Sequence, residues 1–338
     1  MRALRPTFGD MSKRAKPGTK RLSEVGEAAL IERIARRAGR TPGRDWALRI
    51  GDDAAILRPR AGDELVFSTD AYVENSHFRF GRESARTIGR RAMVANLSDL
   101  AAMGAEPVGA LLALSAPRDG ALADFDGIVR GLLDEAERFA CPLVGGNLTH
   151  ARAWSLDVTV IGRCPRGKAL RRRGLRPGDA LFVTGTLGGA TLARLKADRA
   201  GSALRQVAVP RIAVGRALAR IEGVRACIDL SDGLATDLRH LLEGTGLGAE
   251  LDPAALPRPR GFDRGCSVMG LDPLRVIAGG GEDYELLFSL RSGRDDSVPM
   301  RRISALAKRL GIPITRIGQI RSENGIQGLP QAGRGHHF

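Results

Sequence analysis

The chain has 338 residues, of which 43% are hydrophobic and 27% charged, proportions typical of a soluble globular protein with one or two domains. No apolar run approaches the roughly 20 residues of a membrane-spanning helix, which argues against an integral membrane protein. The formal net charge is +15, but only 4% of the residues are aromatic, too few for a base-stacking platform. Composition therefore argues against a nucleic-acid partner and is compatible with a small anionic one, such as a nucleotide.

Two further features bear on the cellular compartment. The first 22 residues are basic and lack the apolar segment of a secretory signal, so we predict a disordered basic arm at 1–22, with translation starting at Met1 or Met11. The four cysteines lie far apart without a CxxC pair, which argues against zinc and against a disulfide framework. Free thiols are typical of a reducing compartment, so we expect a cytoplasmic protein.

The first half of the chain alternates predicted strands and helices. Apolar residues at helical spacing predict helices at 23–39, about 84–104 and 124–140. Strands are predicted to lead into "GDDAAIL" (51–57) and to end at "STD" (68–70), and further strands at 108–117, 142–146 and 155–164. Strands and helices in this order indicate a sheet covered by helices.

A domain boundary is predicted before residue 180, where Pro177-Gly178-Asp179 has turn chemistry. Beyond it we expect a strand at 180–185, a helix after "GTLGGA" (185–190) and a strand–turn–helix at 226–242. The chain then continues through "GGGEDYEL" (279–286) to a helix and strand at 302–320. We predict an α/β (α+β) protein with an N-terminal domain at 23–166 and a C-terminal domain at 167–338.

Carboxylates gather at the predicted strand ends, next to Gly, Ser or Thr. The residues concerned are Asp52, Asp53, Asp70, Asp229, Asp232, Glu282 and Asp283. If these strand ends share one edge of a sheet, the carboxylates converge and repel one another unless cations hold them together. Hard oxygen ligands of this kind suit Mg²⁺ that bridges to phosphates.

Each of these short motifs also has a purely structural explanation. Ser231 or Asp232 in "SDGL" could cap a helix, and "GDD" could be a turn. "GTLGGA" lacks the Lys-Ser/Thr of a P-loop, so helix packing explains it better than phosphate binding. His77, one of five histidines, could be structural or could contact a phosphate or substrate.

Asp99 is harder to explain by structure alone. It shares one predicted helical face with Ile88, Ala92, Ala95 and Ala102. A carboxylate within such an apolar stripe is costly unless it is paired, so we expect a metal or cation beside it, with Asn96 near enough to donate or accept a hydrogen bond. Nucleophilic catalysis has no support, because the chain has no GxSxG elbow and no cysteine with a base nearby in sequence. We predict no covalent catalytic residue.

Taken in order, the motifs resemble those of the thiamine-monophosphate kinase family. They are "IGDDAAIL", "STDAYVENSHF", "NLSDLAAMGAEP", "LVGGN", "GKALRRRGLRPGDALFVTGTLGGA", "IDLSDGLATDL" and "GGGEDYEL". The resemblance runs from about residue 23 to the C-terminus. It places the chain in the superfamily of aminoimidazole-ribonucleotide synthetase, selenophosphate synthetase and the hydrogenase maturation factor of the same fold.

The resemblance implies two α/β domains, a homodimer formed through the N-terminal sheet, and ATP bound with several Mg²⁺ ions. The implied metal ligands are Asp53, Ser68, Thr69, Asp70, Asp99, Asn147, Asp229 and Asp232. Gly146, Asn147, Arg172 and Ser231 would contact ATP, and His77, Glu282 and the position of Gly335 would contact thiamine monophosphate. The implied reaction is direct, in-line transfer of the γ-phosphoryl group of ATP to the substrate phosphate, to give thiamine diphosphate.

Two positions depart from the family pattern. Asn147 stands where the family has Asp, so one metal site loses a charged ligand. Gly335 stands where the family has an aromatic residue, two positions before the final His-Phe. These departures leave open a same-fold enzyme with a different acceptor. A second alternative is a non-enzymatic ATP-binding or nucleic-acid-binding protein that uses the basic arm.

Overall fold

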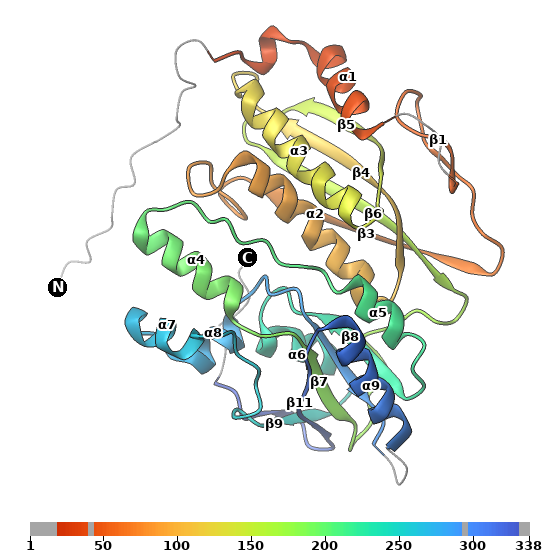
Figure 1. The fold of residues 1–338 in the computed structure, drawn as a ribbon, viewed down its shortest axis with the longest axis vertical. Coiled ribbons are helices and arrows are strands. Elements are labelled where there is room, and N and C mark those ends of the chain that lie inside the picture. Colours follow the sequence, from red (N-terminus) through yellow and green to blue (C-terminus); the bar gives the residue numbers. More distant parts are fainter. Residues whose placement is uncertain (1–18, 40–43, 293–296, 331–338) are drawn as a thin grey trace.

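The computed structural model describes residues 19–39, 44–292 and 297–330, which form two successive α/β units (Figure 1). The first unit contains a four-stranded sheet in the order β3-β6-β4-β5. Its strands are β3 (Asp63–Val73), β4 (Glu106–Ala116), β5 (Leu143–His150) and β6 (Ser155–Pro165). β6 is antiparallel to β3 and β4, whereas β4 and β5 are parallel, because helix α3 (Leu122–Arg138) crosses between them.

Helices cover one face of this sheet; on the other face Trp46 packs against Val108, Val144 and Ile161, and the β3 side of that face stays open. Helix α2 (Ala85–Ala102) packs beside α3 on the covered face, and α1 (Glu27–Ala38) contacts α3 and β5 (Figure 1). The 3₁₀ helix η1 (Leu22–Glu24) precedes α1, and β1 (Trp46–Leu48) pairs with β2 (Ile56–Leu57) in a separate ribbon. On the open face of β3, the Phe67 side chain is 62% exposed and that of Leu65 37% exposed.

The second unit is built on a six-stranded sheet in the order β12-β9-β11-β7-β10-β8. The strands are β7 (Ala180–Thr184), β8 (Val224–Asp229), β9 (Gly248–Leu251), β10 (Leu286–Leu290), β11 (Ile314–Arg321) and β12 (Gly325–Gln327). The helices are α4 (Gly189–Ala200), α5 (Ile212–Leu218), α6 (Leu234–Leu242), α7 (Phe262–Met269), α8 (Pro273–Gly279) and α9 (Ser297–Leu310). The two-domain α/β fold predicted from the sequence is therefore confirmed.

Helix α2 joins the two units. It contacts α5 and β8 of the second unit, and the contact with α5 is close because Gly215 has no side chain. A Cβ atom at Gly215 would lie 1.9 Å from the carbonyl oxygen of Ala101. This packing brings the end of β8, an edge strand, against the C-terminal half of α2, so residues more than 100 positions apart meet there.

The structure differs from the predictions in three places. β3 does not end at Ser68–Asp70 but continues to Val73, because Asp70 pairs with Val158 of β6 and the ladder extends beyond it. α2 is buried on nearly all sides rather than along one stripe, since both units pack on it. Residues 20–22, assigned from sequence to the disordered arm, are packed: the amide of Leu122 donates to the Lys20 carbonyl, and Leu22 is buried. Residues 1–18 of the predicted arm lie outside the described residues.

Candidate active site

Three of the predicted carboxylates meet where α2, β3 and β8 come together. The hydroxyl of Ser68 on β3 donates to Oδ2 of Asp99 on α2. One residue earlier on α2, the Ser98 hydroxyl donates to Oδ2 of Asp229, the last residue of β8, over 2.7 Å. The Asn96 side chain accepts a 3.0 Å hydrogen bond from the backbone amide of Asp70. The Ser98 side chain of α2 therefore holds the end of β8 beside Asp99, and the Asn96 side chain holds the Asp70 segment of β3 there.

The charges of these carboxylates act on one another. Burial, followed by the charge of Asp229 and with a smaller contribution from that of Asp70, raises the pKa of Asp99 to about 7. Burial also raises the pKa of Asp229, which is only 4% exposed, and Asp70 contributes there too. The Arg172 cation lowers the pKa of both Asp99 and Asp229. Carboxylates that repel one another in a partly buried site are a donor set that fits a hard divalent cation.

Three predicted metal ligands lie away from this cluster within the described chain. Asp53 lies in an exposed turn, where its amide donates to Asp52. Thr69 faces the open side of the sheet, where its hydroxyl is bonded to Thr159 and to the Val158 carbonyl. Asn147 is on β5, the far edge of the sheet from β3.

The distance to β5 follows from the register of the sheet. Asp70 pairs with Val158, Val158 with Leu112, and Leu112 with Gly146. Three strand spacings of about 4.8 Å put Gly146 roughly 14 Å from Asp70. Gly146 itself is required by close packing, since a Cβ there would lie 2.0 Å from the Leu112 carbonyl oxygen. Within one chain, Gly146 and Asn147 therefore do not join the carboxylate cluster.

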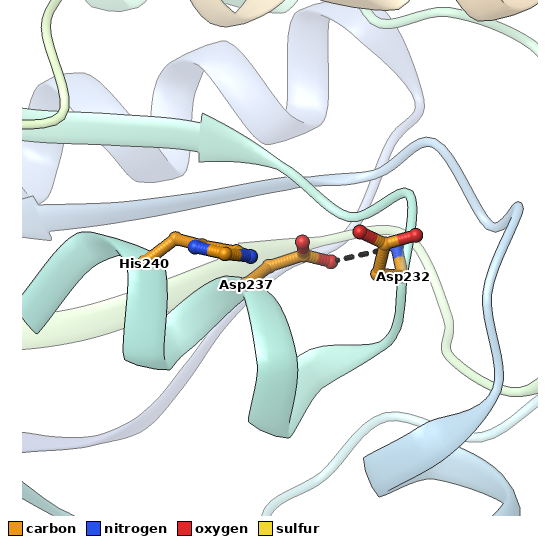
Figure 2. A group of neighbouring side chains, drawn as sticks. All are labelled: Asp232, Asp237 and His240. Carbon is orange, nitrogen blue, oxygen red and sulfur yellow. Dashed lines mark hydrogen bonds between the residues drawn. The ribbon is translucent and has the colours of Figure 1, made fainter. Parts of the chain in front are cut away.

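A second acidic group forms at the turn after β8. Ligand atoms of Asp232, Asp237 and His240 lie within 4.8 Å of one another (Figure 2). The backbone amide of Asp232 donates to Oδ2 of Asp237 over 3.0 Å, and burial, followed by the charge of Asp229, raises the pKa of Asp237 to about 8. Sequence reasoning missed Asp237 and His240, although their i, i+3 spacing places them on one face of α6.

This geometry excludes helix capping as the explanation of "SDGL". The residue that caps α6 is Gly233, and no side chain caps the helix. Asp237, in the first turn of α6, instead accepts from the turn, so neither Ser231 nor Asp232 serves as a cap. The carbonyl of Ser231 accepts from the amide of Glu282, which ties this turn to the "GGGEDYEL" segment.

The predicted substrate contacts line two cavities on either side of α4. His77, whose Nδ1 accepts from the Val73 amide over 3.0 Å, lines a cavity of about 170 Å³ with residues of α4. Glu282 lines a cavity of about 430 Å³ together with Gln206 and Arg211. Gly335, the third predicted contact, lies outside the described residues.

Glu282 is held by a residue that sequence reasoning missed. Arg91 of α2 is buried and forms salt bridges with Glu282 and, over 3.0 Å, with Glu83. Glu282 and Tyr284 have positive φ values of 66° and 50°. Residues other than glycine adopt this backbone conformation only at a cost in free energy. Arg91 therefore holds a strained loop of the second unit against a helix of the first.

"GTLGGA" is confirmed as a packing element rather than an anion site. The amides of Gly188 and Ala190, at the start of α4, donate to the Asp283 carboxylate over 2.6 and 3.1 Å. Burial raises the pKa of Asp283 to about 6, although these two hydrogen bonds oppose the shift. The helix N-terminus is thus occupied by a side chain of this protein.

Family comparisons agree with this architecture. Residues 51–164 match the AIR synthase related protein, N-terminal domain, and residues 176–328 match the AIR synthase related protein, C-terminal domain. The thiamine-monophosphate kinase of Mycobacterium tuberculosis strain H37Rv is 36% identical over 273 residues, 79% of this chain and 81% of the relative. That of Escherichia coli strain K12 is 37% identical over 317 residues, 90% of this chain and 92% of the relative. The chain belongs to the thiamine-monophosphate kinase family.

Solved structures extend the match to three dimensions. The crystal structure of thiamine-monophosphate kinase from Stenotrophomonas maltophilia K279a has a TM-score of 0.76 at 34% identity, over 90% of this chain and 96% of that one. AaThiL complexed with AMPPCP and TMP has a TM-score of 0.69 at 26% identity, over 95% of this chain and 100% of that one. Escherichia coli HypE, a hydrogenase maturation protein, has a TM-score of 0.70 at 22% identity, over 88% of this chain and 93% of that one, and shares the fold.

Proposed function

We propose that this protein transfers the γ-phosphoryl group of ATP to thiamine monophosphate, giving thiamine diphosphate and ADP. The observation that carries the proposal is the cluster of Asp70, Asp99 and Asp229 at the meeting of α2, β3 and β8. The AaThiL structure of the same fold holds AMPPCP and TMP, which supports ATP and thiamine monophosphate as the substrates.

We infer that the carboxylate cluster holds Mg²⁺. Asp70, Asp99 and Asp229 would supply charged oxygen ligands, with the Ser68 hydroxyl beside them. Mg²⁺ held there would neutralise the phosphate charge that keeps two polyanions apart. Asp232 stands at the neighbouring turn, with Asp237 and His240 near it. We infer that Arg172, whose charge acts on the cluster, contacts an ATP phosphate.

The residues at hand fit direct transfer rather than a covalent intermediate. The acceptor phosphate is already ionised near neutral pH, so no strong general base is needed. Cys227, two residues before Asp229, has its pKa raised by burial, and burial raises the pKa of Cys141 to about 12. Thiols that stay protonated are poor nucleophiles. Positioning and charge neutralisation remain as the sources of rate enhancement.

The acceptor test uses purified full-length protein with ATP, Mg²⁺ and a panel of acceptors. We expect thiamine monophosphate to yield thiamine diphosphate and ADP in equal amounts, measured by liquid chromatography. Turnover of another phosphorylated acceptor, with no thiamine diphosphate, would establish the alternative that Asn147 and Gly335 motivate. ATP binding without turnover on any acceptor would instead favour the non-enzymatic alternative.

We propose that the protein is a homodimer formed through the open face of the N-terminal sheet. Phe67 and Leu65 are exposed there, and burying them would be favourable. Light scattering should give twice the mass of one chain, and Phe67→Glu should halve it. A monomeric wild-type protein would contradict this assembly.

Metal binding predicts a specific pH dependence of stability. The raised pKa values of about 7 for Asp99 and about 8 for Asp237 mean that these groups bind protons in the native state that the unfolded chain releases above about pH 4. The stability that Asp99 and Asp237 contribute is fully present below about pH 4. It is lost as the pH rises through their native pKa values. In EDTA, the unfolding temperature should fall between about pH 5 and pH 8. Mg²⁺ should remove the slope, and a profile that is flat without Mg²⁺ would contradict the prediction.

We also infer a reducing compartment, and hence the cytoplasm, for this protein. All four cysteines are free and buried. Among the helices in the described ranges, none is both long and apolar enough to cross a bilayer.

A further inference from the structure

A further cavity, of about 550 Å³, lies between the linker at 167–173, the 219–225 segment that leads into β8, and helix α9. One carboxylate, that of Glu222, lines it. The cationic side chains that line it are Lys168, Arg171, Arg173, Arg220, Arg225 and Arg302. A cavity of this size falls in the range of about 300 to 1,000 Å³ found for small-molecule sites.

Among the residues that the structure describes, few acidic side chains compensate the charges of this cavity. Arg225 lies 3.5 Å from Asp179. The other five cationic side chains form no salt bridge with any residue that the structure describes. Some basic residues elsewhere are paired, as where Arg33 and Arg37 share Asp126. An Arg-rich surface alone does not explain why unpaired cations gather in one concavity, where their repulsion opposes folding.

The linker at 167–173 borders both this cavity and the carboxylate cluster. The Arg171 carbonyl accepts a 2.8 Å hydrogen bond from the amide of Cys227, two residues before Asp229. Arg171 and Arg173 line the cavity, whereas the charge of Arg172, between them, acts on Asp99 and Asp229. The same short segment therefore serves two sites that differ in charge.

We propose that this cavity binds a small phosphorylated anion with at least two negative charges, at a site separate from the carboxylate cluster. Guanidinium groups bind phosphate oxygens through paired, charge-assisted hydrogen bonds. Several guanidinium groups around one concavity favour a compact polyanion, such as a diphosphate. The anion would offset the repulsion among the lining cations.

The test is titration calorimetry of full-length protein with inorganic pyrophosphate in EDTA. Without divalent cations the carboxylate cluster repels pyrophosphate, so binding reports the basic cavity and is independent of kinase activity. The double variant Arg173→Gln/Arg302→Gln removes two cavity charges. The control Arg166→Gln/Arg309→Gln removes two exposed charges nearby, from residues that do not line the cavity, and keeps the same net charge.

We expect one pyrophosphate per chain for the wild type and the control, and binding at least about tenfold weaker for the cavity variant. Circular dichroism should show both variants folded. If pyrophosphate binding weakens equally in both variants, net charge alone explains the effect and the proposed site is overturned. Absence of pyrophosphate binding by the wild type would also overturn it. A duplex oligonucleotide that binds more tightly than pyrophosphate and is lost only in the cavity variant would overturn the small-anion assignment in favour of nucleic acid.

Discussion

Asp99→Asn is expected to lower kcat by about 100- to 1,000-fold or more, because it removes a charge from the set that stabilises the transferring phosphoryl group. The fold should survive, since the asparagine oxygen can still accept the hydrogen bond from Ser68. In EDTA the variant should even be more stable than the wild type near neutral pH. The carboxylate it replaces is disfavoured by burial and by Asp229, and a neutral amide avoids both costs.

A loss of activity together with a gain in stability distinguishes a metal ligand from a residue that serves the fold alone. Asp124→Asn is the matched control: burial raises the pKa of Asp124 as well, but Asp124 lies on α3, away from the cluster. Kinetics at saturating ATP and Mg²⁺, with thermal unfolding in EDTA, measure both responses. A kcat for Asp99→Asn within about threefold of the wild type would remove Asp99 from the metal site.

Strong periodicity made much of the fold predictable. The alternation in 155–164 predicts β6 (Ser155–Pro165) almost to the residue, and helical spacing in 84–104 predicts α2 (Ala85–Ala102). The end of β3 could not be predicted, because Ser68-Thr69-Asp70 has the local propensity of a turn. The ladder with β6 overrides that propensity, and it places Ser68 next to Asp99 while Thr69 faces the open side.

The site was predictable in part, for a related reason. Asp99 stood out because a carboxylate in an apolar helix needs a partner; the structure supplies the Ser68 hydroxyl, whereas the neighbouring Asp229 adds a repelling charge that favours a bound cation. Arg91 gave no such signal, because an arginine on a helix is ordinarily exposed to solvent. Its burial depends on the second unit, which brings Glu282 to α2 across 191 positions of sequence. Local pattern does not encode contacts of that kind.

Arg91→Leu is expected to destabilise the protein by about 3–5 kcal/mol, because it leaves Glu83 and Glu282 beside each other without their shared cation. The ionised form of Glu83 is already disfavoured in the native state, because burial raises its pKa and the charge of Glu282 adds to the shift. Urea unfolding measures the loss of stability. The KM for the acceptor should also rise, because Glu282 is no longer held at its positive φ.

The double variant Arg91→Leu/Glu83→Gln separates these two effects. Removing the Glu83 charge relieves the repulsion, so much of the lost stability should return. Glu282, however, still lacks the guanidinium that positions it, so the acceptor KM should stay high, while Arg91→Lys should recover it in part through a single ion pair. If the double variant restores stability and KM together, Arg91 serves folding alone. If KM stays high while stability returns, the strained "GGGEDYEL" loop is held for the acceptor by a helix of the other domain.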